Sequence, residues 1–254
     1  MQVSREYLAN SPLSTDAQRD LEKERVQYFE NGVGSISDKL ASITRFISRQ
    51  NVAKFLCYHE VFRMTEGVVG SILECGVYFG NGLMAYAQLA AALEPYNYQC
   101  RIVGFDTFSG DLGVSAKDGH NPFFHREEGD YYADSYEDLK RAIAIYDRDR
   151  PLNHLNKIEL VKGDLCTSAQ EYLQRTPALT VRILHLAVNL YEPTKRALEV
   201  FLPRISRGGV VAVHGANYSA EGAVQAIIDV CGGIDKVRLR TFDFYPNFCY
   251  FVVE

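Results

Sequence analysis

The sequence predicts an α/β fold built on a parallel sheet, and two observations support this prediction. Short runs rich in β-branched and aromatic residues alternate with segments of helical character over residues 71–230. The last two runs are separated by residues 242–247 alone, which is too short for a helical crossover and predicts a hairpin. Strands that alternate with helices form a parallel sheet with helices on both faces.

The predicted strands and helices follow one another in a regular order. The predicted strands are residues 71–77, 101–106, 157–161, 181–188, 209–214, 237–241 and 248–253. The predicted helices are residues 83–93, 135–146, 168–173, 193–205 and 221–230. Five parallel strands followed by an antiparallel hairpin are the layout of the class I methyltransferase sheet, a Rossmann-like architecture.

The chain divides into an arm and an alternating domain. Residues 36–47 and 51–64 place apolar side chains at helical spacing, which predicts a helical N-terminal arm or cap over residues 1–66. Residues 67–254 form the predicted Rossmann-like domain. Within it, residues 109–134 lack periodicity and are rich in Gly, His, Asp and aromatic residues. A loop of this length inside a compact domain is typically functional, and we expect it to contact the substrate.

Composition excludes some classes of partner. The chain has 254 residues, a net charge of −5 and 47% hydrophobic residues, as expected of a globular protein with a full-sized core. Its Lys and Arg residues are not clustered, which argues against nucleic acid or an anionic membrane as partner. No signal-peptide pattern and no apolar run of roughly 18 residues occur, so we expect a cytoplasmic protein. The six cysteines are dispersed without a CxxC pair and are expected to be reduced.

Three strand ends predict a nucleoside-binding site. The first strand runs into the glycine-rich segment from Glu74 to Gly82, where the backbone can approach a ligand closely. The second ends at Asp106, whose carboxylate can accept ribose hydroxyls, and the third runs into Gly163 and Asp164, placed to receive an adenine amino group. Each feature alone can have a purely structural role, since the glycines can allow close packing and the aspartates can cap helices. Together they indicate a ligand at a topological switch point.

The spacing of the glycines favours S-adenosylmethionine over NAD as that ligand. The turn reads Gly-x-x-x-Gly-x-Gly, whereas dinucleotide-binding proteins use Gly-x-Gly-x-x-Gly. The terminal hairpin also favours a methyltransferase sheet. An assignment as a nicotinamide-dependent oxidoreductase would rest only on the similarity of the fold.

The sequence resembles the macrocin (TylF-type) O-methyltransferases, which transfer methyl from S-adenosylmethionine to a sugar hydroxyl. The resemblance runs from about residue 36 to the end and is most specific in Glu-Cys-Gly-Val (74–77), Gly-Phe-Asp-Thr-Phe (104–108) and Leu-Tyr-Glu-Pro-Thr (190–194). It implies S-adenosylhomocysteine as product, a small-molecule acceptor and a homo-oligomer. It implies that the cofactor-binding residues are Glu74, Gly76, Tyr78 and Gly80 around the methionine and ribose, Asp106 with Thr107 at the ribose, and Asp164 with Leu165 near the adenine.

The magnesium site of this family is altered in the chain. The resemblance implies acidic ligands at the ends of the fourth and fifth strands, where this sequence has Ala187, Asn189, His214 and Gly215, and a further Glu where it has Ala223. Magnesium prefers carboxylate and other hard oxygen ligands, and these positions offer a single neutral carbonyl and an imidazole. We therefore expect no catalytic divalent metal at this site.

Without a metal, a general base must take the proton of the acceptor, and His214 at the end of the fifth strand is the candidate. The alternative is a strand-end histidine that bonds only to backbone. His185, inside the apolar fourth strand, is predicted to be a core residue.

The loop at residues 109–134 supplies the candidate substrate contacts. These are His120, His125, Tyr131 and Tyr132, which suit a cover over the acceptor pocket, although a solvated loop explains them equally well.

Two functional hypotheses follow. The first is a metal-independent S-adenosylmethionine-dependent methyltransferase that acts on a small secondary metabolite, with a sugar hydroxyl as the expected acceptor and an amine or carboxylate as the alternative. The second is a cofactor-binding homologue that no longer methylates and serves as a partner subunit or in other chemistry.

Overall fold

The structure is a computed structural model that describes residues 15–118, 127–215 and 221–254. Contacts between residues divide the chain into two compact units, Met1–Lys54 and Phe55–Glu254. We call them the N-terminal unit and the C-terminal unit. Helix α4 (Arg49–Met64) crosses the boundary between them.

The C-terminal unit contains one mixed sheet. In its described residues the sheet has seven strands in the order β3-β2-β1-β4-β5-β7-β6. The strands are β1 (Ser71–Cys75), β2 (Ile102–Asp106), β3 (Ile158–Lys162), β4 (Val181–Leu186), β5 (Ile205–His214), β6 (Arg240–Phe242) and β7 (Tyr245–Val252). Strands β1 to β5 pair in parallel, and β7 pairs antiparallel with β5 and β6. The predicted fold of five parallel strands with a terminal hairpin is confirmed.

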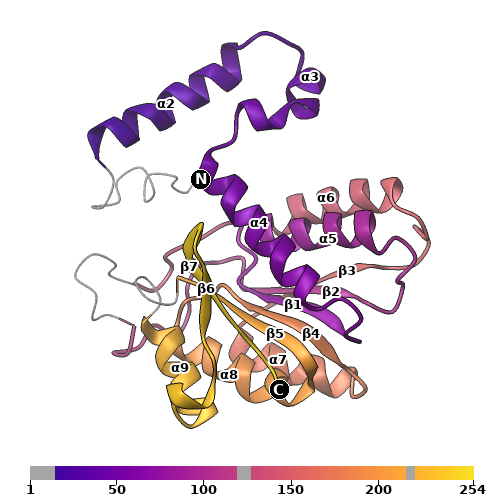
Figure 1. Cartoon of the computed structure of the whole chain (residues 1–254), viewed down its shortest axis with the longest axis vertical. Coiled ribbons are helices and arrows are strands. Elements are labelled where there is room, and N and C mark those ends of the chain that lie inside the picture. The colour runs from indigo at the N-terminus through magenta and orange to yellow at the C-terminus, as the bar shows by residue number, and fades with distance from the viewer. Residues whose placement is uncertain (1–14, 119–126, 216–220) are drawn as a thin grey trace. The chain divides into compact units, whose positions relative to one another are not determined.

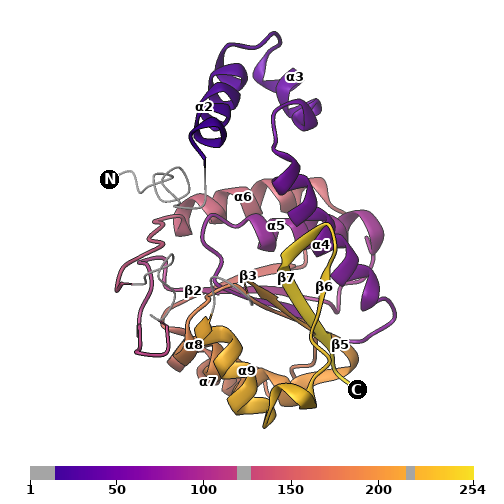
Figure 2. The ribbon, with the colours of Figure 1, turned by 60° about the vertical axis from the view of Figure 1, so that its left-hand side comes forward.

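Helices cover both faces of this sheet, as Figures 1 and 2 show. One face packs against α5 (Asn81–Leu93), α6 (Tyr136–Asp149) and the C-terminal part of α4. The other face packs against α7 (Leu165–Arg175), α8 (Tyr191–Phe201) and α9 (Glu221–Cys231). Two 3-10 turns, η2 (Leu202–Arg204) and η3 (Ile234–Lys236), precede β5 and β6. Because strand order reverses between β1 and β4, the carboxyl ends of these strands open a crevice.

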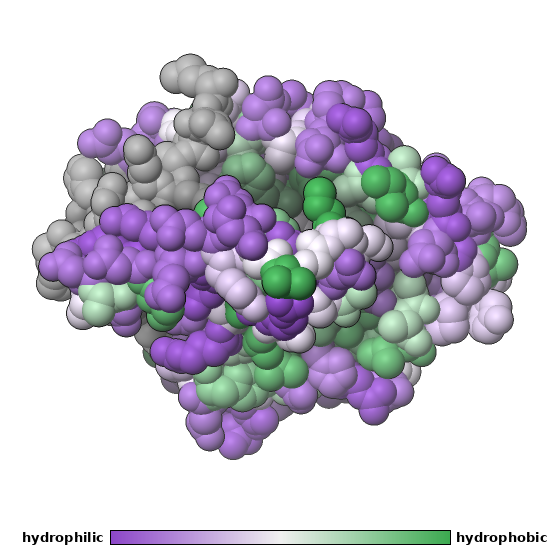
Figure 3. Space-filling model, turned by 90° about the horizontal axis from the view of Figure 1, so that it is seen from above, coloured by the Kyte–Doolittle hydropathy of each residue, from purple (hydrophilic) through white to green (hydrophobic). Residues whose placement is uncertain are grey.

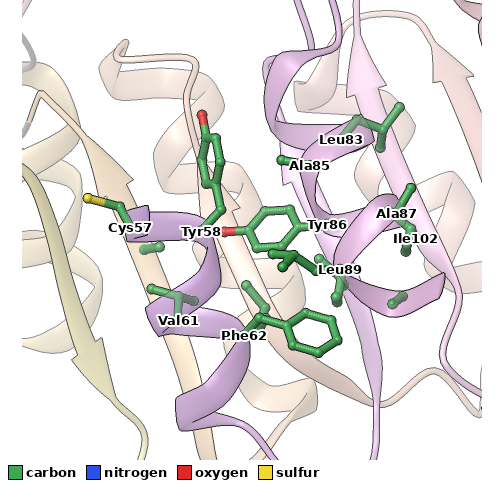
Figure 4. Packing of buried hydrophobic residues seen from close by; sticks show 14 of the residues in the cluster. Cys57, Tyr58, Val61, Phe62, Leu83, Ala85, Tyr86, Ala87, Leu89 and Ile102 are labelled. Atoms are coloured by element: carbon green, nitrogen blue, oxygen red, sulfur yellow. The ribbon is translucent and has the colours of Figure 1, made fainter. Parts of the chain in front are cut away.

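Burial explains why the central strands are almost continuously apolar. Every residue of β1 and β4 is buried, since both faces of the sheet are covered. The core is correspondingly split into one hydrophobic cluster on each face. Figure 4 shows the cluster between α4 and α5, where the side chain of Tyr86 extends toward Tyr58. The ring centroids of the two residues lie 5.3 Å apart. Burying a large apolar side chain of this kind contributes about 1.5–3 kcal/mol.

The N-terminal unit is helical. It contains α2 (Asp16–Asn31), α3 (Ile36–Ala41) and the 3-10 turn η1 (Ile43–Arg45). Thr15 with Gln18 and Ser35 with Asp38 form capping boxes that satisfy the first N–H groups of α2 and α3. Helix α2 has no buried residue. Figure 3 shows from above that hydrophobic residues are scattered among hydrophilic ones on the surface.

Most element boundaries differ by a few residues from the sequence-based prediction, and three differences have a clear cause. The terminal hairpin closes through Asp243 and Phe244 alone, because Phe242 already pairs with Tyr245. Helix α7 begins at Leu165 rather than at residue 168, since Asp164 caps it. The predicted helix at residues 36–47 is interrupted at Ser42, which is the C-cap residue of α3.

Two further sequence-based expectations concern cysteines and membranes. All six cysteines are free, and Cys57, Cys75, Cys100 and Cys249 are buried. In the part of the chain that the structure describes, no helix has the length and apolar character needed to cross a membrane.

Candidate functional site

The glycine-rich turn after β1 lies directly against the end of β4. Gly76 has a φ of 93°, a conformation that favours glycine. A Cβ atom on Gly76 would lie 2.8 Å from the carbonyl carbon of Ala187 and from the nitrogen of Val188. The Ala187 N–H donates to the Cys75 carbonyl over 2.7 Å. Glycine at position 76 therefore permits a close approach of two strand ends that a side chain would block.

Asp106, at the end of β2, fixes the same turn. Its Oδ2 accepts hydrogen bonds from the backbone N–H groups of Val77 and Tyr78 over 2.7 and 2.8 Å. Its Oδ1 accepts from the Phe108 N–H over 2.7 Å. Tyr78 and Phe108 both have positive φ angles, 54° and 55°, which are uncommon for non-glycine residues. The Asp106 carboxylate thus holds two strained backbone segments at the crevice.

Asp164 organises the third strand end. It is the N-cap of α7, and its Oδ1 accepts from the Cys166 N–H over 2.9 Å. The preceding Gly163 donates its N–H to the Asp106 carbonyl over 2.9 Å, which ties the ends of β2 and β3 together. The helix-cap reading of Asp164 is therefore correct, and it leaves the other carboxylate oxygen of Asp164 at the crevice.

A cavity of about 690 Å³, including its open mouth, occupies the crevice. The lining residues come from the ends of β1, β2, β3 and β4, from the start of α8 and from the loop after β2. They are Gly76, Tyr78, Phe105, Asp106, Thr107, Gly110, Asp111, Leu112, Tyr131, Gly163, Asp164, Leu165, Ala187, Val188, Asn189, Leu190 and Pro193.

Most of the cofactor residues inferred from the sequence line this cavity. They are Gly76, Tyr78, Asp106, Thr107, Asp164 and Leu165. Glu74 and Gly80 lie outside it. Gly80 is the N-cap of α5, in a left-handed conformation, and a Cβ there would lie 2.3 Å from Leu139. Gly80 thus shapes the turn through packing.

Glu74 is buried beneath the turn, with 2% of its surface exposed. Its Oε1 lies 3.0 Å from Nδ1 of His185 on β4. Burial, followed by the negative charge of Glu74, raises the pKa of Tyr58 well above its usual range. Within the described residues, Glu74 Oε2, His185 Nε2 and the Tyr86 hydroxyl have no hydrogen-bond partner. His185 is a core residue, as expected, although only one of its ring nitrogens is satisfied.

The loop after β2 contributes one of the four predicted substrate contacts to the cavity. Tyr131 lines the cavity, and its ring centroid lies 6.1 Å from that of Tyr78. Tyr132 is half-buried and does not line it. His120 and His125 lie outside the described residues.

Sequence reasoning missed the part of the wall formed by Asp111, Leu190 and Pro193. The motif Leu-Tyr-Glu-Pro-Thr at residues 190–194 was a signal for two of them. It marks the start of α8, which follows directly on the end of β4.

The positions expected to hold magnesium offer few ligands. Ala187 and Asn189 line the cavity, whereas Ala223 is buried in the core beside α8. Across the described ranges, no group of three or more His, Cys, Asp or Glu side chains could hold a metal ion. This donor set does not fit a magnesium ion, which binds proteins through carboxylates.

His214 ends β5 and is half-buried. Because Leu186 pairs with Val213, His214 is the neighbour of Ala187 across the parallel ladder. Its ring lies 6.0 Å from that of Tyr245 and 6.2 Å from that of Phe248. The cavity lining does not include His214, which lies one strand away from it.

Comparison with known proteins identifies the family. Residues 73–216, more than half of the chain, match the methyltransferase domain family. The chain belongs to this family. The matched region begins within β1, runs through β5 and contains every strand end that lines the cavity.

Solved structures of other proteins share the methyltransferase architecture. A crystal structure of CalS11, the calicheamicin methyltransferase, matches with a TM-score of 0.89 and 25% identity over 99% of this chain and 98% of that chain. The apo structure of CalS11, described as TDP-rhamnose 3′-O-methyltransferase, matches with a TM-score of 0.81 and 26% identity over 94% of this chain and 95% of that one. The O-methyltransferase NovP shares the fold, with a TM-score of 0.60 and 21% identity over 81% and 79% of the two chains. Among curated proteins, none matches the sequence.

The protein is therefore an S-adenosylmethionine-dependent methyltransferase. Its cavity suits this cofactor, since the wall has both apolar side chains, which can contact the adenine ring, and carboxylates, which can accept hydrogen bonds from hydroxyl and amino groups.

Proposed function

We propose that the protein is an O-methyltransferase of the macrocin type that methylates a sugar hydroxyl of a small metabolite. The observation that carries this proposal is the match to CalS11, a TDP-rhamnose 3′-O-methyltransferase, over 99% and 94% of this chain in two structures. The match includes the N-terminal unit as well as the methyltransferase domain. The motifs at residues 74–77, 104–108 and 190–194 support the same family.

The reaction is an in-line displacement on the methyl carbon of the cofactor. The acceptor oxygen forms a bond to this carbon while the carbon–sulfur bond breaks, and the electron pair of that bond stays on sulfur. S-adenosylhomocysteine leaves as product, and the acceptor proton passes to a base. Holding the two reactants in line supplies a large part of the rate in such a reaction.

The cavity residues account for cofactor binding. Gly76 and Tyr78 lie where the methionine portion would pass over the turn, and Asp164 with Leu165 lies where the adenine would bind. The Asp106 oxygens accept three backbone hydrogen bonds, and a carboxylate offers about four acceptor positions. One position therefore stays available to a ribose hydroxyl, with Thr107 beside it.

Glu74 and Gly80 act indirectly in this proposal. Glu74 fills the space beneath the turn, where Gly82 leaves room for its carboxylate, and Gly80 lets α5 begin. The conformation of the turn depends on both residues without a contact between either of them and the cofactor.

His214 is the proposed general base. Its position at the carboxyl end of β5, the neighbour of Ala187 of the cavity wall across the parallel ladder, supports this role. An imidazole can take a proton near neutral pH. This role replaces the Lewis-acid function that carboxylate-bound magnesium has in related enzymes.

The proposed oligomer contact is the N-terminal arm or cap over residues 1–66, which includes the N-terminal unit. Helix α2 buries none of its residues, and hydrophobic side chains of this unit, including Val33, Ile36 and Leu40, are more than half exposed. A homo-oligomer would cover part of this surface.

A second candidate function is a cofactor-binding subunit that does not transfer methyl. The replacement of acidic ligands by Ala187, Gly215 and Ala223 favours it, because an idle site tolerates such changes.

One experiment separates these functions. The purified protein is incubated with S-adenosylmethionine labelled in the methyl group and with TDP-rhamnose, other TDP-sugars and amine-bearing sugars, once with magnesium and once with EDTA. Label transferred to a sugar oxygen supports the proposal. Weak or absent binding of S-adenosylhomocysteine in a calorimeter, with no transfer to any acceptor, supports the subunit function.

A further inference from the structure

The mouth of the cavity is formed by the two described ends of the loop after β2. Of the described residues that line the cavity, Leu112 and Tyr131 are the exposed ones, at 42% and 40%. Lining residues at the strand ends, such as Phe105 and Leu165, are buried. The cavity therefore has a floor of strand ends and a mouth at which Leu112 and Tyr131 meet the solvent.

Backbone hydrogen bonds hold the two ends of the loop side by side. The Asp111 N–H donates to the Asp130 carbonyl over 2.7 Å, and the Gly129 N–H donates to the Asp111 carbonyl over 2.9 Å. Leu112 directly follows Asp111, and Tyr131 directly follows Asp130. The two exposed side chains therefore start from backbone segments that are fixed relative to each other.

Ser135 ties the same end of the loop to the turn after β1. Ser135 is the N-cap residue of α6, but its side chain makes no capping hydrogen bond. Its hydroxyl donates instead to the Tyr78 carbonyl. The rings of Tyr78 and Tyr131 meet edge to face, with centroids 6.1 Å apart and planes inclined by 65°. The ring of Tyr131 thus has a defined place opposite Tyr78.

Both tyrosines have a strained backbone. Tyr131 has a φ of 55° and Tyr78 a φ of 54°, in the left-handed region that bulky residues seldom adopt. Such conformations are energetically costly and cluster at ligand sites. Asparagine or glycine would adopt this backbone more easily. The presence of an aromatic ring at position 131 despite the strain indicates that the ring contacts a ligand.

The acceptor is the ligand that the mouth can reach. In the function proposed above, Asp106 and Asp164 hold the adenosine at the floor of the cavity, and the acceptor oxygen must approach the methyl carbon in line with the breaking bond. Tyrosine presents an apolar ring and a polar hydroxyl, and Leu112 adds an apolar surface. A sugar has a matching character, because its C–H face is apolar and its edge carries hydroxyls.

We propose that Tyr131 is a specificity-determining residue for the acceptor, whose sugar packs its C–H face against the Tyr131 ring with Leu112 beside it. Tyr78 supports the ring of Tyr131 from the side. The proposal rests on the proposed function, and it assigns the mouth of the cavity to the sugar and the floor to the cofactor.

The test separates acceptor binding from cofactor binding. Methyl transfer is measured with the TDP-sugar that the wild type methylates fastest, and S-adenosylhomocysteine affinity is measured in a calorimeter. Tyr131→Asn removes the ring and suits the left-handed backbone. It is expected to raise KM for the TDP-sugar about tenfold, the effect of one lost aromatic contact, and to leave S-adenosylhomocysteine affinity unchanged.

A second variant distinguishes the ring from its hydroxyl. Tyr131→Phe keeps the ring, so KM should stay within about threefold of the wild-type value, since a neutral hydrogen bond contributes little. Tyr96→Asn is the matched control, because Tyr96 is 73% exposed and does not line the cavity. Asp134→Asn, at an exposed carboxylate between Tyr131 and Ser135, controls for a change at the same end of the loop. Both controls should keep the wild-type KM and affinity.

Four results would overturn the proposal. An unchanged KM in Tyr131→Asn removes the acceptor contact. Weaker S-adenosylhomocysteine binding with an unchanged KM assigns Tyr131 to the cofactor instead. A loss in Tyr131→Phe as large as that in Tyr131→Asn assigns the contact to the hydroxyl rather than to the ring. A wild-type protein that binds S-adenosylhomocysteine and methylates no TDP-sugar refutes the proposed function itself, and the inference with it.

Discussion

The Asp106 carboxylate accepts the backbone N–H of Tyr78 over 2.8 Å, so the end of β2 determines the conformation of the turn that follows β1. Tyr78 is held at a φ of 54° by this contact and lines the cavity. An acidic residue at this position thus has two functions. It restrains the turn and, in the function that we propose, presents a remaining acceptor to a ribose hydroxyl.

Replacing Asp106 should therefore weaken cofactor binding more than the loss of one ribose contact would. Asp106→Asn keeps one carbonyl and cannot accept all three N–H groups. Hydrogen bonds to charged groups contribute about 1.5–3 kcal/mol, so we expect S-adenosylhomocysteine to bind about 10- to 100-fold more weakly in calorimetry. Asp134→Asn should bind as the wild type does. Undiminished affinity in Asp106→Asn would show that the turn holds its shape without the carboxylate.

The sequence predicted the fold and the strand-end residues because both follow from local patterns. Alternation of strands and helices fixes the sheet, and Gly76, Asp106 and Asp164 stand at strand ends that parallel pairing must bring together. The burial of Glu74 was not predictable, since it depends on His185, which lies 111 residues away.

His214→Gln should lower kcat and leave cofactor affinity unchanged. Loss of a general base typically costs about 100-fold or more in rate. His214 does not line the cavity, so its removal should not alter S-adenosylhomocysteine binding. The rate is measured with the acceptor sugar that is identified in the methyl-transfer experiment described above. An unchanged rate would leave His214 as a strand-end residue packed against Tyr245 and Phe248.

Methyl transfer should be insensitive to divalent metals. Asn189 and His214 provide no carboxylate at the ends of β4 and β5, and Ala187 and Gly215 provide no side-chain ligand atom. Magnesium needs hard oxygen ligands. Initial rates after EDTA treatment should equal those with added magnesium. Stimulation of the rate by magnesium would mean that other residues or the substrate itself complete a metal site.

Acid should release the contact between Lys117 and Asp229, which lie 3.1 Å apart. Hydrogen bonds from Tyr191, Gln225 and Lys117 lower the pKa of Asp229 to about 2, below its usual 3.8. A carboxyl whose folded pKa is depressed binds fewer protons when folded, so its contribution to stability is present above pH 3.8 and is lost as the pH falls toward 2. The difference in melting temperature between wild type and Asp229→Asn should shrink over this interval. A difference that is constant with pH would assign the stabilisation to packing.

Breaking the buried pair of Glu74 and His185 should destabilise the protein strongly. The two side chains are 3% and 1% exposed, and removing one partner of such a pair typically costs about 3–5 kcal/mol because the other stays buried and unpaired. His185→Phe should therefore lower the free energy of unfolding by this amount in urea titrations. The double variant Glu74→Gln with His185→Phe should recover most of the loss, since the charge that lacks a partner is gone. Equal losses in the single and double variants would show that the aromatic rings of Tyr58 and Phe248, which surround His185, set the stability of this region.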